Sequence, residues 1–190
     1  MKAKLLYTSL CAALFMACSG SDSDDVSGSS VSNTLHLSFA TPDWDRFINC
    51  EQLDLDPIGI NELTNYVSAT SASTKETFFF SIPADSSAMV APGNLKKYSI
   101  SDFGSNDEPF QFSQKLPITS GSTTYLASKA GMSETSYNEV VDIKYTGSEG
   151  SYAVFKVKCK YQMDAYEVGN EANVKPVSGT FHFKVRTSKD

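Results

Sequence analysis

The sequence predicts an all-β fold, either a sandwich of two antiparallel sheets or a flattened barrel. Several runs alternate between apolar and polar residues, which is the two-residue period of a half-buried strand, and the longest are 151–163 and 177–187. Gly, Pro, Ser and Asn gather between these runs, and no convincing amphipathic helix follows residue 33. Residues 34–190 are long enough for one domain with its own core.

The first predicted strand is 34–40, with Leu35, Leu37 and Phe39 on the buried face and His36 on the polar face. Pro42 ends it because proline cannot donate to a strand ladder.

Residues 43–63 are ambiguous. Trp44, Phe47 and Ile48 have helical spacing, whereas residues 49–55 could alternate as a strand. Further strands are expected in five short runs rich in β-formers, at 63–70, 76–82, 95–101, 110–112 and 121–127.

The C-terminal third predicts a meander of three antiparallel strands at 139–146, 151–163 and 177–187. The residues expected on the inner face are apolar: Val141, Ile143, Tyr145, Phe155, Val157, Cys159, Tyr161, Met163, Phe181, Phe183 and Val185. Gly179 suits a bulge or a close backbone approach where the last strand enters the sheet.

The N-terminus predicts a lipoprotein signal peptide over residues 1–17. Lys2 and Lys4 precede an apolar run at 5–16, which is too short to span a bilayer, and Cys18 follows as the residue to be acylated. The competing interpretation is a plain secretory signal that is cleaved near Ala17 without lipid. Residues 18–33 are expected to form a lipidated, disordered linker that holds the 34–190 domain about 20 Å from the membrane.

Two short segments of the chain resemble parts of a known protein family. Cys18-Ser-Gly-Ser-Asp-Ser-Asp-Asp25 looks like the start of Bacteroidota lipoproteins, in which an acidic run after the lipidated cysteine directs export to the cell surface. Pro176-Val-Ser-Gly-Thr-Phe-His-Phe183 resembles the last strand of small uncharacterised Bacteroidota surface lipoproteins. The resemblance implies a compact β-domain anchored in the outer membrane and exposed at the cell surface, with no catalytic residues to carry over. A solvated acidic linker is the simpler interpretation of the first segment.

Charge excludes one class of partner. Without Lys2 and Lys4, the 16 basic residues become 14 against 22 acidic ones, so the mature chain carries a net charge of about −8. This argues against nucleic acid as a partner.

Two cysteines, Cys50 and Cys159, remain in the predicted domain. In an oxidising compartment they could form a disulfide, which would raise the free energy of unfolding by roughly 4–5 kcal/mol in the chain-entropy model. The alternative is two buried thiols that never meet.

A possible binding face lies on the outward side of the last two strands. Its basic members are Lys156, Lys158, Lys160, His182, Lys184 and Arg186. Such a face could meet an anionic glycan, the lipopolysaccharide surface or an acidic envelope protein, although an ordinary solvated sheet face, with lysines that discourage edge-to-edge aggregation, is the simpler interpretation. Trp44 could stack on a sugar ring or anchor the core.

Metal and catalytic sites have little support. His36 and His182 would share a face if the first and last strands paired, but two solvated strand histidines are the simpler expectation. The acidic loop 102–108 departs from the calcium-binding EF-hand spacing. The chain contains no nucleophile elbow, phosphate loop or His-Glu-x-x-His motif, and no cofactor is expected.

The sequence therefore predicts a non-catalytic, lipid-anchored envelope protein that binds a ligand or partner or has a structural role. The alternative is a lipocalin-like carrier of a small apolar molecule, with Phe78, Phe79 and Phe80 lining its cavity.

Overall fold

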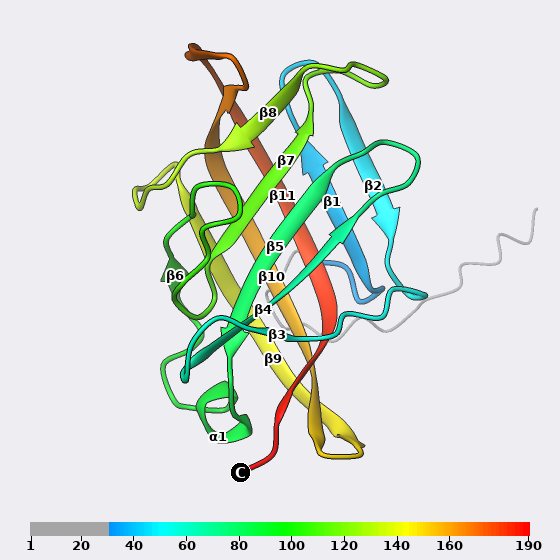
Figure 1. Ribbon diagram of the computed structural model, residues 1–190, viewed down its shortest axis with the longest axis vertical. Coiled ribbons are helices and arrows are strands. Elements are labelled where there is room, and N and C mark those ends of the chain that lie inside the picture. Colours follow the sequence, from blue (N-terminus) through cyan, green and yellow to red (C-terminus); the bar gives the residue numbers. More distant parts are fainter. Residues whose placement is uncertain (1–30) are drawn as a thin grey trace, which may run out of the picture.

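A computed structural model describes residues 31–190, which form one antiparallel sheet of eleven strands and one short helix (Figure 1). The predicted signal peptide, Cys18 and most of the predicted linker lie outside the described residues. The elements are β1 (His36–Ala40), β2 (Asp45–Asn49), β3 (Ile58–Gly59), β4 (Thr64–Thr70), β5 (Thr77–Pro83), α1 (Ser86–Met89), β6 (Lys97–Tyr98), β7 (Phe112–Pro117), β8 (Tyr125–Ser128), β9 (Tyr137–Glu149), β10 (Tyr152–Glu167) and β11 (Asn170–Ser188).

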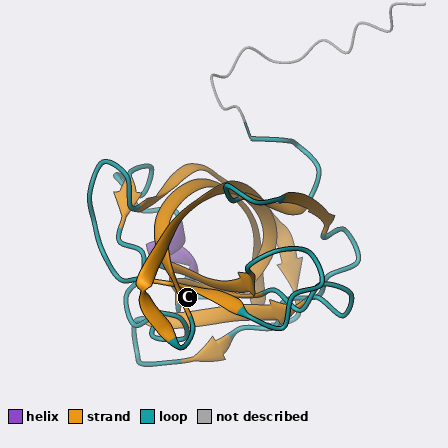
Figure 2. Cartoon of the chain, turned by 90° about the horizontal axis from the view of Figure 1, so that it is seen from above, coloured by secondary structure: helices purple, strands orange, loops and turns teal. Residues whose placement is uncertain are grey.

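The sheet runs in the order β2-β1-β11-β10-β8-β7-β5-β4-β3, and β9 pairs with both β10 and β6. Seen from above, the strands curl round a central axis, so the sheet has an inner and an outer face (Figure 2). β2 and β3 end the path without pairing with each other, and the sheet is not closed into a barrel. The predicted all-β, antiparallel class is confirmed.

Aromatic rings from facing walls of the sheet meet in the core. Phe78 on β5 stacks on Phe183 of β11 with 4.6 Å between ring centroids, and Phe112 on β7 lies 4.5 Å from Tyr161 on β10. Neither pair of strands shares a ladder, so these contacts join opposite walls, as in a sandwich. Burial of such rings is the main term that stabilises the fold.

The C-terminal meander is confirmed, because β10 pairs with β9 on one side and with β11 on the other. The inner residues predicted for β10 and β11 are all buried. The prediction for β9 is wrong at two positions: Tyr145, expected on the inner face, is 54 % exposed, and Val141 is displaced. A register shift pairs Cys159 with Val140 and leaves Val141 as the extra residue of a bulge, so Val140 is the buried residue.

Gly179 marks a close approach, as predicted. A Cβ atom at this position would lie 2.0 Å from the Ser38 carbonyl oxygen on β1 and 2.7 Å from the Tyr161 hydroxyl. The hydroxyl donates to that same carbonyl at 3.0 Å and lies 2.9 Å from the Gln114 side-chain amide. The missing side chain therefore lets Tyr161 connect β10 to β1.

Helical spacing was one interpretation of residues 43–63, but the structure has a strand, β2, at the start of this segment. β2 follows a tight turn in which the Thr41 N–H donates to the Trp44 carbonyl, and the segment after β2 is irregular until β3. None of the helices among residues 31–190 has the length and apolarity that a membrane crossing requires.

Candidate functional site

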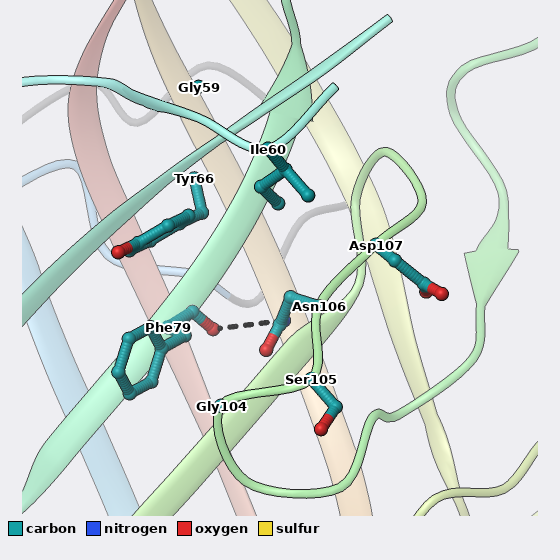
Figure 3. A pocket seen from close by; sticks show the side chains of 8 residues that line it. All are labelled: Gly59, Ile60, Tyr66, Phe79, Gly104, Ser105, Asn106 and Asp107. Carbon is teal, nitrogen blue, oxygen red and sulfur yellow. Dashed lines mark hydrogen bonds between the residues drawn. The ribbon is translucent and has the colours of Figure 1, made fainter.

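A surface cleft of about 400 Å³ lies on the outer face of β4 and β5. Figure 3 shows Tyr66 and Phe79 on one side of it, the 104–107 loop on the other, and Ile60 between them. Its volume falls within the range of about 300–1,000 Å³ that is typical of small-molecule and anchor-residue sites. The residues that line the cleft are Gly59, Ile60, Tyr66, Phe79, Gly104, Ser105, Asn106 and Asp107.

The floor of the cleft belongs to an aromatic stripe on the outer face of the sheet. Tyr66 and Phe79 have ring centroids 5.4 Å apart, and Phe79 meets Phe103 edge to face at 5.3 Å. The Lys115 ammonium lies 4.9 Å from the Phe103 centroid and 5.5 Å from that of Tyr125. All five side chains are only partly buried, so the stripe offers apolar surface to a ligand.

Side-chain hydrogen bonds attach the 104–107 wall to the sheet. Asn106 donates from its amide to the Phe79 carbonyl (3.4 Å), the bond drawn in Figure 3, and accepts from the Ser113 hydroxyl (2.6 Å). The Gly104 N–H donates to the same Ser113 hydroxyl (3.2 Å). Asn61 crosses from the other wall and donates to the Asp107 carbonyl (3.2 Å). The cleft is therefore largely preformed.

Gln111 holds the base of this loop. Its side-chain oxygen accepts from the Asp107 and Glu108 N–H groups and from the Ser101 hydroxyl, at 2.8–3.2 Å. The preceding residue, Phe110, adopts a left-handed φ of 63°, which is unusual for a bulky residue. Its buried ring and the bond from its N–H to the Ser81 carbonyl hold it there.

The two walls carry negative charge only. Glu62 lies on one wall loop, and Asp102, Asp107 and Glu108 lie on the other; all four are exposed, and neither loop contains a basic residue. In Figure 3 the Asp107 side chain points away from the Tyr66 and Phe79 rings. The cleft thus combines an aromatic floor with an acidic rim.

A second hollow, of about 430 Å³, lies beside α1. The last two residues, Lys189 and Asp190, form one of its walls, and that wall is joined to α1 by bonds from Ser86 and Ser87 to the Asp190 carboxylate. One of its walls is thus the end of the chain, whereas the 104–107 wall of the cleft is bonded to β5 and β7, so the cleft is the stronger candidate.

The predicted basic face is largely neutralised by carboxylates. Lys160 pairs with Glu139 at 3.2 Å, and Lys184 pairs with Glu149 at 2.6 Å. Arg186 contacts Glu149 at 2.7 Å and also pairs with Asp54 and Asp56. Hydrogen bonds from Lys184 and Arg186 lower the pKa of Glu149. Lys158 bonds the Asn33 side chain, and Lys156 has no ion pair within residues 31–190.

The two histidines do become neighbours, because His36 and His182 are register partners in the β1–β11 ladder. The expectation that they are solvated is wrong, since they are 0 % and 5 % exposed. The Phe47 ring on β2 stacks on His36 at 4.8 Å, and the Thr34 carbonyl accepts from His36 Nδ1 at 2.8 Å, so β2 and the segment before β1 both cover His36.

Burial lowers the pKa of both imidazoles below 6.5, and the Lys158 ammonium lowers it further. No group of three His, Cys, Asp or Glu side chains within residues 31–190 could hold a metal ion. The paired histidines therefore act as neutral packing groups.

Trp44 is an anchor and does not join the basic face. Its ring meets Phe39 edge to face at 4.8 Å, and its indole N–H donates to the Pro117 carbonyl at 3.0 Å. Because β1 and β7 are not paired, this contact connects two separate parts of the sheet.

Cys50 and Cys159 are free, buried thiols, so the possible disulfide is not formed. Two strands separate β2 from β10, which places the cysteines about 14 Å apart along the sheet, beyond the roughly 7 Å limit for bridged Cα atoms. Burial raises the pKa of Cys50 to about 11 and raises that of Cys159 as well.

The sequence pattern did not indicate the cleft. Phe78, Phe79 and Phe80 were expected to line one cavity, but Phe78 and Phe80 point inward and Phe79 points to the outer face. The alternation of side chains along a strand would have separated Phe79 from its neighbours. Nothing in the sequence would have placed the 104–107 loop beside it.

A comparison of the chain with protein-family models, with curated proteins and with solved structures finds no match. Function is therefore inferred from the chemistry of the chain's own residues.

Proposed function

We propose that this is a lipid-anchored, non-catalytic protein of the outer membrane, exposed at the cell surface, whose β-domain binds a ligand or partner through the cleft. The pattern of residues 1–18 and the acidic run that follows support the anchor and the location. The observation that carries the binding role is the cleft, in which partly buried Tyr66 and Phe79 lie between two hydrogen-bonded loops.

The placement of the reactive side chains supports a non-catalytic role. The two histidines and two cysteines are buried away from the cleft, and none of them lines it. Asp107 is the one carboxylate among the lining residues, and it has no neighbouring base there. General acid–base catalysis uses an acid and a base positioned at the reacting atoms, and Asp107 has no such partner among the lining residues.

The core argues against the alternative role as a carrier of a small apolar molecule. Phe80 lies 4.9 Å from Phe181, and Phe112 stacks on the same ring at 4.9 Å. Rings from opposite walls thus occupy the space that a lipocalin-like ligand would need. The outer cleft is the better place for a ligand.

The anchor is tested by comparing the wild type with Cys18→Ala in cells fed labelled palmitate. We expect label and membrane fractionation for the wild type only, and cleavage of the wild type by protease added to intact cells. Equal fractionation of the two proteins, without label, would refute the anchor. Protection from protease in intact cells would refute surface exposure.

The binding role is tested with envelope material separated into polysaccharide, protein and lipid fractions. The mature protein should bind one fraction, and Tyr66→Ala should weaken that binding by about tenfold or more. The matched control is Tyr152→Ala, which removes a more exposed tyrosine (40 % exposed) at the β9–β10 hairpin, outside the cleft. Equal loss in both variants, or none in either, would contradict a binding role for the cleft.

A further inference from the structure

Exposed aliphatic side chains extend the aromatic floor of the cleft. Ile58 stands directly opposite Tyr66 in the β3–β4 ladder, so the two side chains share the outer face. Ile58, Ile60 and Leu63 are 49 %, 38 % and 72 % exposed. Exposed aliphatic side chains beside an aromatic floor indicate a surface that a partner covers.

The negative charge around the patch determines which charge a partner must carry. Four exposed carboxylates, on Glu62, Asp102, Asp107 and Glu108, lie on the two wall loops, Asp107 lines the cleft, and neither loop contains a basic residue. They attract cations and repel phosphates and acidic polysaccharides. The nearest basic group of the stripe, Lys115, already lies against the Phe103 and Tyr125 rings.

The chemistry of the lining favours a peptide over a saccharide. Sugar hydroxyls need hydrogen-bond partners when they lose water; the polar groups of Ser105 and Asp107 lie on the loop wall, whereas Ile58 and Ile60 beside the aromatic floor offer none. The Asn106 amide is already bonded to Phe79 and Ser113. A bulky apolar side chain, by contrast, needs only the floor of the cleft, and a neighbouring Lys or Arg could pair with the rim.

We infer that the cleft receives a segment of another protein in which a bulky apolar side chain stands next to basic residues. This inference rests on the proposed function and names the class of partner. The apolar side chain lies between Tyr66, Phe79 and Ile60, and the basic residues face Asp107 and Glu108. The bound segment is anchored by the apolar contact, while the charges raise its rate of association.

The test is a selection from a random peptide library on the full-length mature protein. The library is first depleted on the Tyr66→Ala variant, so that only peptides that need the cleft remain. Peptides that survive are synthesised and titrated against the wild type, Ile60→Ser, the double variant Asp107→Asn/Glu108→Gln, and the control Tyr152→Ala. Ile60 is on an exposed loop, so its substitution keeps the test valid if Tyr66→Ala fails to fold.

We expect peptides that combine Lys or Arg with Leu, Phe or Trp. Ile60→Ser should weaken them about tenfold, and Tyr152→Ala should leave them unchanged. The double variant should lower mainly the association rate and its dependence on salt. Selection of acidic or purely polar peptides would overturn the inference.

Other occupants give distinct results. Tyr66-dependent binding of a neutral polysaccharide, with no peptide selected, would overturn the inference and leave the proposed function standing. A concentration-dependent dimer that Ile60→Ser abolishes in sedimentation would replace the partner with a second copy of the chain. If no probe depends on the cleft, both the inference and the proposed binding role fail.

Discussion

Replacing Gly179 with alanine tests how the last strand is joined to the first. The new Cβ would lie 2.0 Å from the Ser38 carbonyl oxygen, and no real Cβ contact is that short. The obstacle is backbone on the neighbouring strand, so it cannot turn aside as a flexible side chain would. The φ of Gly179 is not left-handed, so the cost of the substitution is steric and not conformational.

Two contributions make up the expected loss of stability in Gly179→Ala. Overpacking a tight site costs about 1–3 kcal/mol. Displacing the Tyr161 hydroxyl, which would lie 2.7 Å from the new atom, leaves the Ser38 carbonyl without its donor and costs a further 1–3 kcal/mol or so. We therefore expect the free energy of unfolding to fall by about 3 kcal/mol or more. At about 2–4 °C per kcal/mol, Tm falls by about 6–12 °C.

The measurement is urea denaturation of the mature chain followed by circular dichroism. Gly131→Ala is the matched control, because Gly131 is also half-buried and its Cβ would meet the Ser136 hydroxyl at an ordinary 3.5 Å. That variant should stay within about 0.5 kcal/mol of the wild type. A Gly179→Ala protein as stable as Gly131→Ala would show that β1 and β11 are not this close.

The double variant Gly179→Ala/Tyr161→Phe separates the two obstacles. Removing the hydroxyl relieves the 2.7 Å contact but leaves the 2.0 Å contact with the Ser38 carbonyl. The double variant should therefore remain at least about 2 kcal/mol less stable than Tyr161→Phe alone. Full recovery would assign the whole effect to Tyr161.

Burial lowers the pKa of His36 and His182, so the unfolded chain binds more protons once the pH falls below about 6.5. The free energy of unfolding should then fall between pH 7 and pH 5, by up to about 1.4 kcal/mol per pH unit for each histidine, and a flat profile in urea titrations would contradict their burial. Cys50 and Cys159 should react with a thiol reagent only as fast as the chain unfolds, because their pKa values are raised and both are buried. Peptide mapping without reductant should find both as free thiols, and a bridged peptide would disprove their separation. Trp44→Phe removes an indole donor from a carbonyl of β7 and should lower the free energy of unfolding by about 1 kcal/mol without changing binding at the cleft. Weaker binding at unchanged stability, by thermal melts and titration, would instead give Trp44 a place in the site.

Alternation along the chain predicts most of the sheet because a strand exposes successive side chains to opposite faces. It places Tyr161 and Phe181 inside and Lys158 outside, as the structure has them. It fails at Val141, where a bulge adds one residue and reverses the face. It also misjudges how far β7 extends, because the segment 112–117 carries buried polar residues such as Gln114.

The sequence by itself determines which residues of the long strands face the core, because that follows from a local period of two. Only the tertiary structure decides what covers the outer face. The alternation predicts that His36 is solvated, but in the structure Phe47 and the Thr34 carbonyl enclose it. The contact between the 104–107 loop and Phe79 likewise exists only in the folded protein. The contacts of Phe47 and of the 104–107 loop join residues on different strands or far apart in the chain, and their energy depends on packing that no local pattern encodes.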